Sequence, residues 1–422
     1  MISELRTSFP DIPDPILWKV ELLFRGVRFT EELADAAREG AAPNFWPYRK
    51  KDSSGSVQTI PVPYLFRLET GEVARVRVDD NSSLQVRRKA PGSAFELCDG
   101  DTPLCAIQFV QSHAWQSQRL KDGSTLFSAG VEQLGDMLVV NVAPGCEYFR
   151  VKDAAGHSMR CGYCAYGRID QRSQMFGQQE GKVAVDASML AKLGEALTIA
   201  LAGSEARHIY VTGGSLLSPE DEARRFAPVI EVVRRAAGDR VRVTCGSGAV
   251  RKQDSQRYRD AGADSCCYNL EVWDPDTFRA VCPGKDHYVG RDTWIEALIG
   301  ATEVFGRGNV GSAFVAGVEM RPPAPVMTAD QMLASITEGA GFLLDRGIVP
   351  LYSPLWPVEG TVYGTDDGIS PELFLELQRR TLKMRQARAF PVPAWLICRG
   401  CSYMLMEVDF DHAFQLRPAV SA

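Results

Sequence analysis

The chain has 422 residues, of which 45% are hydrophobic and 24% are charged, and this composition is typical of a globular protein with a sizeable core. It excludes a fibre, a disordered tail and a disulfide-stapled miniprotein. Forty-seven basic residues against fifty-three acidic ones give a formal charge of −6, so there is no excess of positive charge for phosphate backbones or anionic membranes. Nucleic acid is therefore disfavoured as a partner.

The sequence also predicts the compartment. No stretch approaches the roughly 20 apolar residues of a membrane span, and the first 26 residues lack the pattern of a secretory signal. The eleven cysteines are an odd number, which favours a reducing compartment where thiols bind metal or stay reduced. We expect a cytoplasmic protein without a membrane partner.

Residues 1–136 predict a small α+β region. Residues 16–40 have an amphipathic helical pattern, and the polar residues 50–57 predict a loop. Between residues 61 and 110, short β-type runs alternate with turn signals, which predicts β-hairpins. The polar stretch QSHAWQSQR that follows predicts a surface loop.

From residue 137 onward, short apolar runs alternate with helical patterns. We expect strands in 137–145, 207–214, 240–248, 265–273, 309–319 and 348–356. We expect helices in 184–203, 219–237, 252–262, 289–305, 328–346 and 370–388. Six strand-then-helix units predict an α/β fold with a parallel sheet, either doubly wound or curled into a partial (βα)6 TIM-like barrel over 137–390. In both cases, functional groups sit at the carboxyl ends of the strands. Residues 391–422 form a short tail with a CRGC motif.

Three cysteines follow the first of these strands. Cys146, Cys161 and Cys164 have the spacing C-x14-C-x2-C in one loop. Three protein thiolates would leave one iron of a 4Fe–4S cluster open to a chelating substrate. The alternatives are a zinc loop completed by His157, or three unlinked thiols.

This loop resembles that of the radical S-adenosylmethionine superfamily, whose usual pattern is C-x3-C-x-aromatic-C. In that superfamily the three cysteines hold the cluster, and the fourth iron binds the amino and carboxylate groups of S-adenosylmethionine. The first two cysteines here are further apart than in the usual pattern, but C-x14-C-x2-C is known for some 7-carboxy-7-deazaguanine synthases. The resemblance implies that Cys146, Cys161 and Cys164 are the cluster ligands and that Tyr163 lies at the cofactor.

Other strand ends are similar to the biotin-synthase-like branch of the superfamily. Gly213, Gly214 and Ser215 resemble its GGE-type motif, and YNLEVWDPDTF resembles its ribose-binding strand, which implies Asn269 and Glu271. The resemblance also implies that Arg291 binds the methionyl carboxylate. It implies that Val318 lies in the adenine-contacting segment, 311–319. PVEGT at 357–361 is similar to a late PxxGT loop of the same branch.

The resemblance implies reductive cleavage of S-adenosylmethionine to a 5′-deoxyadenosyl radical. That radical would then transform a small-molecule substrate by rearrangement, cyclisation or carbon–carbon bond formation. A one-electron donor such as flavodoxin or ferredoxin is implied as a partner. No residue is predicted to act as a catalytic acid or base, because hydrogen abstraction by the radical requires none.

The remaining cysteines allow further predictions. Cys98 and Cys105 with Cys398 and Cys401 are two pairs that predict a possible second site, holding Zn²⁺ or an auxiliary iron–sulfur cluster, with free thiols as the alternative. A second set can be read as the holder of a sulfur-donating cluster: Cys245, Cys267 and Cys282. Adjacent Cys266 and Cys267 must face opposite sides of a strand.

Two other functions remain open from the sequence. One is sulfur or methylthio insertion with an auxiliary cluster. The other is a metal-stabilised binding module without catalytic activity.

Overall fold

The computed structural model describes residues 2–39, 45–51, 55–88, 90, 92–165, 183–358, 360–364 and 368–416. The chain divides into two compact units, each described by itself. Unit 1 consists of Met1–Ser112 and Cys398–Ala413, and unit 2 consists of His113–Ile397 and Phe414–Ala422. None of the described helices is long and apolar enough to cross a membrane.

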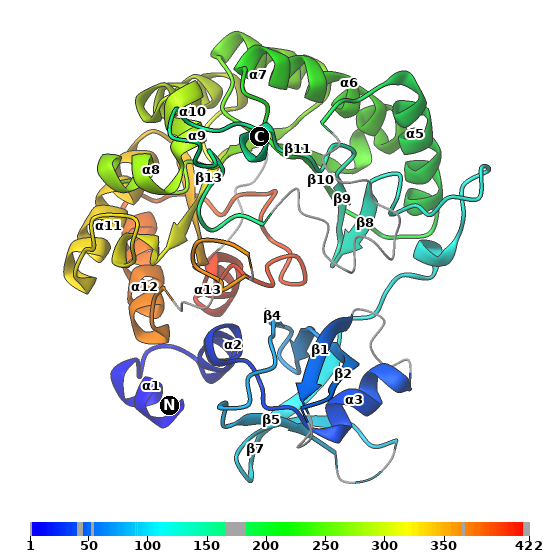
Figure 1. The fold of residues 1–422 in the computed structure, drawn as a ribbon, viewed down its shortest axis with the longest axis vertical. Helices are drawn as coiled ribbons and strands as arrows, with labels where there is room; N and C mark the ends of the chain where they lie inside the picture. Colours follow the sequence, from blue (N-terminus) through cyan, green and yellow to red (C-terminus); the bar gives the residue numbers. More distant parts are fainter. Residues whose placement is uncertain are drawn as a thin grey trace. The chain divides into compact units, whose positions relative to one another are not determined.

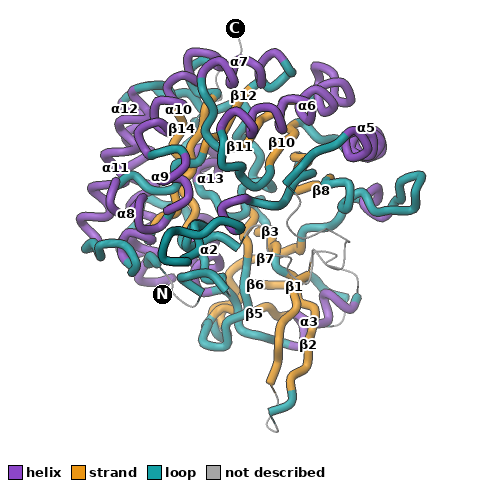
Figure 2. The backbone as a smooth tube through the Cα atoms, turned by 45° about the horizontal axis from the view of Figure 1, so that its top comes forward, coloured by secondary structure: helices purple, strands orange, loops and turns teal. Residues whose placement is uncertain are grey.

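Unit 1 is built on an antiparallel sheet with the strand order β4-β3-β7-β6-β5, and β1 and β2 form a separate antiparallel ribbon (Figure 2). Its strands are β1 (Phe45–Lys51), β2 (Val57–Pro63), β3 (Leu65–Leu68), β4 (Val73–Arg75), β5 (Leu84–Arg87), β6 (Phe95–Asp99) and β7 (Thr102–Phe109). Its helices are α1 (Ile2–Ser8), α2 (Asp14–Arg25), α3 (Glu31–Arg38) and α13 (Glu407–Ala413). Of the loop predicted at 50–57, residues 50 and 51 belong to β1 and residue 57 begins β2, and residues 52–54 lie outside the described residues.

The helical pattern predicted over 16–40 is interrupted at Gly26. This residue has φ +62°, and an added Cβ would lie 2.2 Å from the carbonyl oxygen of Arg77. Glycine alone fits such a close approach at positive φ, so α2 ends there and α3 begins after Thr30, whose side chain caps it.

A buried ion pair joins the two segments of unit 1. The Lys19 ammonium donates to the Asp409 carboxylate at 2.5 Å, and both side chains are fully buried. It also donates to the carbonyl oxygens of Ser402 and Leu405, at 2.6 and 2.8 Å. All three ammonium protons therefore have acceptors in residues 402–409, which ties this segment to α2.

Unit 2 contains a seven-stranded sheet with the order β14-β13-β12-β11-β10-β9-β8. Strands β9 to β14 are parallel, and β8 pairs antiparallel with β9. The strands are β8 (Val131–Leu134), β9 (Met137–Val140), β10 (His208–Thr212), β11 (Arg242–Ser247), β12 (Ser265–Tyr268), β13 (Val310–Ala316) and β14 (Ile348–Pro354). The six predicted strands all contain one of the parallel strands, and the prediction of a mostly parallel α/β sheet is confirmed; β8 was not predicted.

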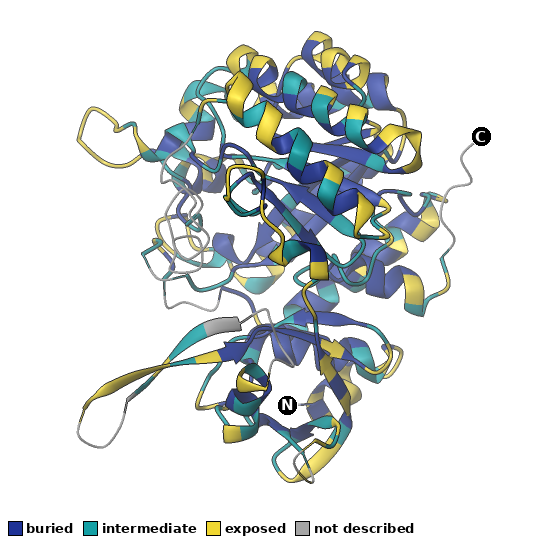
Figure 3. Cartoon of the chain, turned by 90° about the vertical axis from the view of Figure 1, so that its right-hand side faces the viewer, coloured by how far each residue is buried: buried dark blue, intermediate teal, exposed yellow. Residues whose placement is uncertain are grey.

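Helices surround the outside of this sheet (Figure 1). They are α5 (Ala187–Ala202), α6 (Pro219–Ala237), α7 (Lys252–Asp260), α8 (Pro275–Val281), α9 (Pro283–Tyr288), α10 (Arg291–Phe305), α11 (Ala329–Asp345) and α12 (Pro371–Ala387). Figure 3 shows buried strands beneath helices with exposed outer faces. Six helices coincide with predictions, whereas α8 and α9, each shorter than two full periods of a helical pattern, lie outside the predicted helical ranges.

The end of the sheet at which its parallel strands begin is closed by Trp395. Its indole Nε1 donates to the carbonyl oxygen of Gly308 at 2.8 Å, and a Cβ added to Gly311 would lie 2.7 Å from the indole ring. Phe390 and Cys267 pack in the same cluster. The opposite end, where the strands terminate, carries the loops described below.

The compact units divide at His113 and Cys398, whereas the sequence predicts limits at 136/137 and 390/391. Trp115 accounts for part of the difference. It is buried, donates from Nε1 to Gln133 Oε1 on β8 at 2.9 Å, and lies where a Cβ on Gly203 would contact it at 2.8 Å. The stretch predicted as a surface loop therefore contributes a core residue to unit 2.

Replacing Lys19 with Met would leave the Asp409 carboxylate buried without its partner. We expect the variant to destabilise unit 1 by about 3–5 kcal/mol, the usual cost of breaking a buried ion pair. Hydrogen exchange followed by mass spectrometry should show early loss of protection in α13. The control is Arg6→Met, whose ion pair with Asp14 is 46% and 41% exposed and should contribute at most about 1 kcal/mol. Unchanged protection of α13 in the Lys19 variant would contradict this assignment.

Candidate active site

The cysteine loop begins where β9 ends. Cys146 precedes a short 3₁₀ turn (Glu147–Phe149), and the Glu147 amide donates to the carbonyl oxygen of Ser215 at 2.8 Å. The Glu147 carboxylate in turn accepts from the Leu217 amide at 2.9 Å. The loops after β9 and β10 are thus joined at the first cysteine.

Gly214 is in close contact with the backbone of the cysteine loop. Its amide donates to the carbonyl oxygen of Ala143 at 3.1 Å. An added Cβ would lie 2.2 Å from the Gly145 oxygen and 2.7 Å from Cys146 Cα. Only a residue without a Cβ fits this contact.

The second cysteine is fixed by contacts with two other loops. The Gly162 amide donates to Val281 at the end of α8, and Gly162 accepts from the Val362 amide after β14, both at 2.8 Å. Arg160 Nη2 donates to the Gly360 oxygen at 2.8 Å. The predicted 357–361 loop therefore contacts the cysteine loop, although Glu359 within it lies outside the described residues.

The three thiols differ in their surroundings. Burial, with a smaller contribution from Cys161, raises the pKa of Cys146 to about 11. The pKa of Cys161 is lowered, chiefly because the Cys282 thiol donates a hydrogen bond to its sulfur. Burial raises the pKa of the Tyr163 hydroxyl, and the neighbouring Cys161, Cys282 and Cys164 add smaller contributions.

His157 does not join the cysteines. It lies in an exposed turn, with its side chain 79% exposed and Nδ1 3.1 Å from Asp153 Oδ2. Among the described residues, no metal-ligating group of three contains it. The zinc loop completed by His157 therefore has no support.

The predicted ribose-binding residues are held by a lysine that the sequence reasoning missed. Lys285 Nζ lies 2.8 Å from Glu271 Oε1 and donates to the Asn269 carbonyl oxygen at 2.7 Å. Glu271 has φ +74°, which is unusual for a residue with a side chain. The Asn269 Oδ1 atom accepts from the Ala313 amide at 3.2 Å and from the Cys267 thiol at 3.1 Å.

A second missed pair supports the loops after β10 and β11. Glu222 accepts from the amides of Leu216 and Gly248, both at 2.9 Å, and pairs with Arg225 at 2.8 Å. Arg225 also donates to the Gly214 carbonyl oxygen. Burial raises the pKa of Glu222, and Arg225 and the two amides oppose that effect. In the sequence, Glu222 is marked only as an acidic residue in the first turn of α6. Such residues are common at helix amino ends, so this position does not indicate a role in the site.

Arg291 lies at the first position of α10. Its Nε donates to the Trp273 carbonyl oxygen at 2.7 Å, and its guanidinium stacks on the Trp273 ring at 4.7 Å. The exposed Asp292 carboxylate lies 3.1 Å from Nη1. The side chain is thus anchored beside the strand that carries Asn269 and Glu271.

The segment after β13 contains a buried carboxylate. Val318 and Glu319 are fully buried, and Glu319 Oε2 accepts from the Gly317 amide at 3.1 Å. Glu319 Oε1 has no partner among the described residues, and neither does the buried hydroxyl of Tyr363. Burial raises the pKa of Glu319 to about 7, and burial raises that of Tyr363, with smaller effects of Cys282 and Glu319.

The other predicted cysteine sets are not gathered. Cys98 and Cys105 lie on the neighbouring strands β6 and β7, and the Cys401 amide donates to Cys398 Sγ at 3.3 Å within one turn. Among the described residues, neither these four cysteines nor the set Cys245, Cys267 and Cys282 forms a group of ligand atoms within 4.8 Å of one another, and the same is true of Cys146, Cys161 and Cys164.

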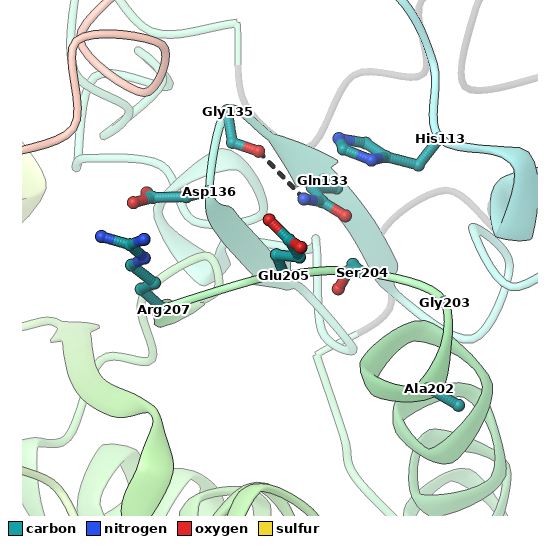
Figure 4. Close-up of a pocket in the computed structure, with 9 residues that line it drawn as sticks. All are labelled: His113, Gln133, Gly135, Asp136, Ala202, Gly203, Ser204, Glu205 and Arg207. Carbon is teal, nitrogen blue, oxygen red and sulfur yellow. Dashed lines mark hydrogen bonds between the residues drawn. The ribbon is translucent and has the colours of Figure 1, made fainter.

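A cavity of about 640 Å³ lies at the amino ends of β9 and β10 (Figure 4). Its lining includes His113, Asp136, Glu205 and Arg207. Because Asp136 directly precedes β9 while Cys146 follows it, this cavity is at the opposite end of the strands from the cysteine loop.

No family model matches the chain. It is 23% identical over 295 residues to the bacteriochlorophyllide c C-7(1)-hydroxylase of Chlorobaculum limnaeum, covering 68% of each chain. Solved structures with which it aligns include the FeFe-hydrogenase maturase of Carboxydothermus hydrogenoformans, at 15% identity and TM-score 0.42, covering 60% of this chain and 52% of that one. Another is methylornithine synthase, at 14% identity and TM-score 0.40, covering 72% of this chain and 92% of that one.

A radical SAM methyltransferase of Sphaerobacter thermophilus aligns at 14% identity and TM-score 0.38, covering 93% of this chain and 92% of that one. The chain is thus similar in sequence to a known enzyme, and its mostly parallel sheet and the order of its motifs agree with what the resemblance to the radical S-adenosylmethionine superfamily implies. Enzymes of this superfamily use a 4Fe–4S cluster and S-adenosylmethionine.

Replacing Gly214 with Ala should disrupt the contact between the loops after β9 and β10. The added Cβ would meet backbone atoms, which cannot rotate away, so we expect a destabilisation of about 1–3 kcal/mol. The matched control is Gly194→Ala within α5, where the Cβ would meet only Val232 Cγ1 at 3.7 Å. That variant should be neutral or more stable by up to about 1 kcal/mol. Chemical denaturation measures both, and equal stabilities would contradict the contact.

Glu319→Gln tests the buried carboxyl. Between its usual pKa of 4.5 and its folded pKa of about 7, the folded protein holds a proton that the unfolded chain has lost. Stability of the wild type therefore falls as pH rises through this window, by about 3 kcal/mol in total. We expect the variant to lack this decline in urea unfolding of the metal-free protein between pH 5 and 8. Parallel pH profiles of the two proteins would contradict the assignment.

Proposed function

We propose that Cys146, Cys161 and Cys164 hold a 4Fe–4S cluster and that the protein generates a 5′-deoxyadenosyl radical to transform a small molecule. The observation that carries the proposal is the position of the cysteine loop. It follows the first parallel strand and is fixed by backbone contacts to the loops after β10 and β14 and to the end of α8. The donor set suits the cluster, because three thiolates leave one iron for the cofactor.

Bound S-adenosylmethionine supplies the radical chemistry, and the chain's own residues bind and orient it. Gly213, Gly214 and Ser215 would offer backbone groups to the methionyl part. Both contacts of the Asn269 side chain among the described residues use Oδ1, which leaves Nδ2 as a donor for the ribose. Lys285 engages Glu271 Oε1, so Oε2 would accept from a ribose hydroxyl.

Arg291 is the proposed partner of the methionyl carboxylate. Its stacking on Trp273 and its bond from Nε fix the guanidinium plane. Its Nη1 contact is with Asp292, whose side chain is 90% exposed. An exposed ion pair contributes little, so a carboxylate ligand could displace Asp292 at small cost.

Val318 and Tyr163 complete the proposed binding site. The buried Glu319 Oε1 and Tyr363 Oη atoms, which lack partners among the described residues, support a polar ligand group nearby. Buried polar atoms without partners are costly, so native proteins usually supply one from the chain, water or a ligand.

Assignment to the biotin-synthase-like branch is part of the proposal and rests on Asn269, Glu271 and the 357–361 loop. The proposed outcomes are rearrangement, cyclisation or carbon–carbon bond formation, with a flavodoxin or ferredoxin as the electron donor. Hydroxylation of an unactivated carbon is a second candidate, because the sequence relative is a hydroxylase. After hydrogen abstraction, the substrate radical would pass one electron to an oxidised one-electron carrier such as a flavodoxin or ferredoxin and take up water, releasing a proton.

Cys161→Ala tests the proposal. We expect the anaerobically reconstituted variant to lose the cluster's colour, most of its iron and 5′-deoxyadenosine formation together. The matched control is Cys266→Ala, a buried β12 cysteine outside the proposed site, which should keep all three. The measurement combines chromatography of 5′-deoxyadenosine with iron and zinc quantitation, under dithionite and S-adenosylmethionine.

The wild type should bind about four irons per chain. Full iron and activity in Cys161→Ala would contradict the ligand assignment. Zinc in place of iron in the wild type, without 5′-deoxyadenosine, would favour the binding-module alternative. About eight irons would favour an auxiliary cluster.

A further inference from the structure

The short segment between α8 and α9 lies directly against the cysteine loop. It consists of residues 282–285, Cys-Pro-Gly-Lys. On one side of Cys161, the Gly162 amide donates to Val281 at 2.8 Å, and on the other, the Gly284 amide donates to Met159 at 2.9 Å. Cys161 lies between the two bonds in the cysteine loop, and Cys282 lies between them in the segment 282–285. The two cysteines therefore lie opposite each other.

Gly284 makes this approach possible. An added Cβ would lie 2.5 Å from the Met159 carbonyl oxygen and 2.6 Å from the Tyr148 ring. Any side chain at position 284 would force the segment away from the cysteine loop. Two side chains of this segment bear on the site: Cys282, two residues before Gly284, and Lys285, directly after it.

Cys282 is one of these side chains. It is fully buried, its sulfur lies 3.8 Å from the Tyr163 hydroxyl, and the two backbone bonds set it directly opposite Cys161. A thiolate that ligates iron has no proton to give, so in this pair Cys282 is the donor and the Cys161 sulfur the acceptor.

Lys285 is the other. Its ammonium is held by Glu271 Oε1 and the Asn269 oxygen, and it lies 4.4 Å from the centre of the Trp294 ring. Its positive charge favours the Cys161 thiolate, and the Glu271 carboxylate opposes this effect. Because the residue is only 6% exposed, its charge is screened less than a surface charge would be.

We propose that Cys282 donates a hydrogen bond to the cluster-ligating sulfur of Cys161 and, with the buried charge of Lys285, raises the reduction potential of the cluster. This inference rests on the proposed function. Reduction adds one electron to the cluster, and hydrogen bonds to its sulfurs and nearby positive charge stabilise that added charge. Cys282 is a positioning and tuning residue and does not ligate iron.

The test is a redox titration of the reconstituted protein, monitored by electron paramagnetic resonance. We expect Cys282→Ala to keep about four irons and to lower the ratio of reduced to oxidised cluster about tenfold at a fixed solution potential, equivalent to about 59 mV for one electron. Cys282→Ser keeps a donor and should recover part of the shift. Lys285→Met should lower the ratio as well, while Lys285→Arg, which keeps the charge, should lower it less.

Cys266→Ala is the matched control and should titrate as the wild type does. Thermal unfolding of the metal-free variants shows whether they fold, and Cys282→Ser serves if Cys282→Ala does not. An unchanged potential in a folded Cys282 variant with full iron would overturn the inference, as would loss of one or more irons, since that would make Cys282 a ligand. Absence of any cluster in the wild type would instead refute the proposed function.

Discussion

The contact between Gly214 and the Gly145–Cys146 backbone is the constraint on which the candidate site depends. Parallel strands bring their carboxyl ends to one edge of a sheet, but this alone leaves the loops free to diverge. Here Gly214, which has no Cβ, lets the loop after β10 contact the loop after β9. Arg225 donates a hydrogen bond to the Gly214 carbonyl oxygen. The Glu222 carboxylate then links this loop to the one after β11 through the Gly248 amide. Three successive strand ends are thereby positioned together.

Much of unit 2 could be predicted because its signals are local. A buried parallel strand reads as a continuous apolar run, and each crossover helix has its own cap or terminal glycine. The features that escaped prediction depend on distant residues. Gly26 ends α2 because Arg77 lies against it, and Trp115 is buried because Gln133 and Gly203 lie beside it. A polar stretch of sequence carries no sign of such a partner.

The candidate site shows the same division. The cysteines, the glycine pair and the Asn269–Glu271 motif stand out because each is a short pattern on one strand end. Lys285 and Cys282 do not stand out, because their partners lie about 14 and 120 residues away in the chain, respectively. A lysine in a short helix reads as a surface residue, and an isolated cysteine reads as core. Only the close approach at Gly284 gives these two residues their relation to Cys161.

The buried charges of the site are balanced in pairs, with one exception. Glu222 pairs with Arg225, and Glu271 pairs with Lys285. Glu319 has no cation beside it and keeps one oxygen without a partner among the described residues. A folded chain tolerates such a group only where something compensates for its cost. Glu319 ends the segment 311–319, which is proposed to contact the adenine. A polar group of the bound ligand would therefore be the partner that compensates for the buried carboxyl.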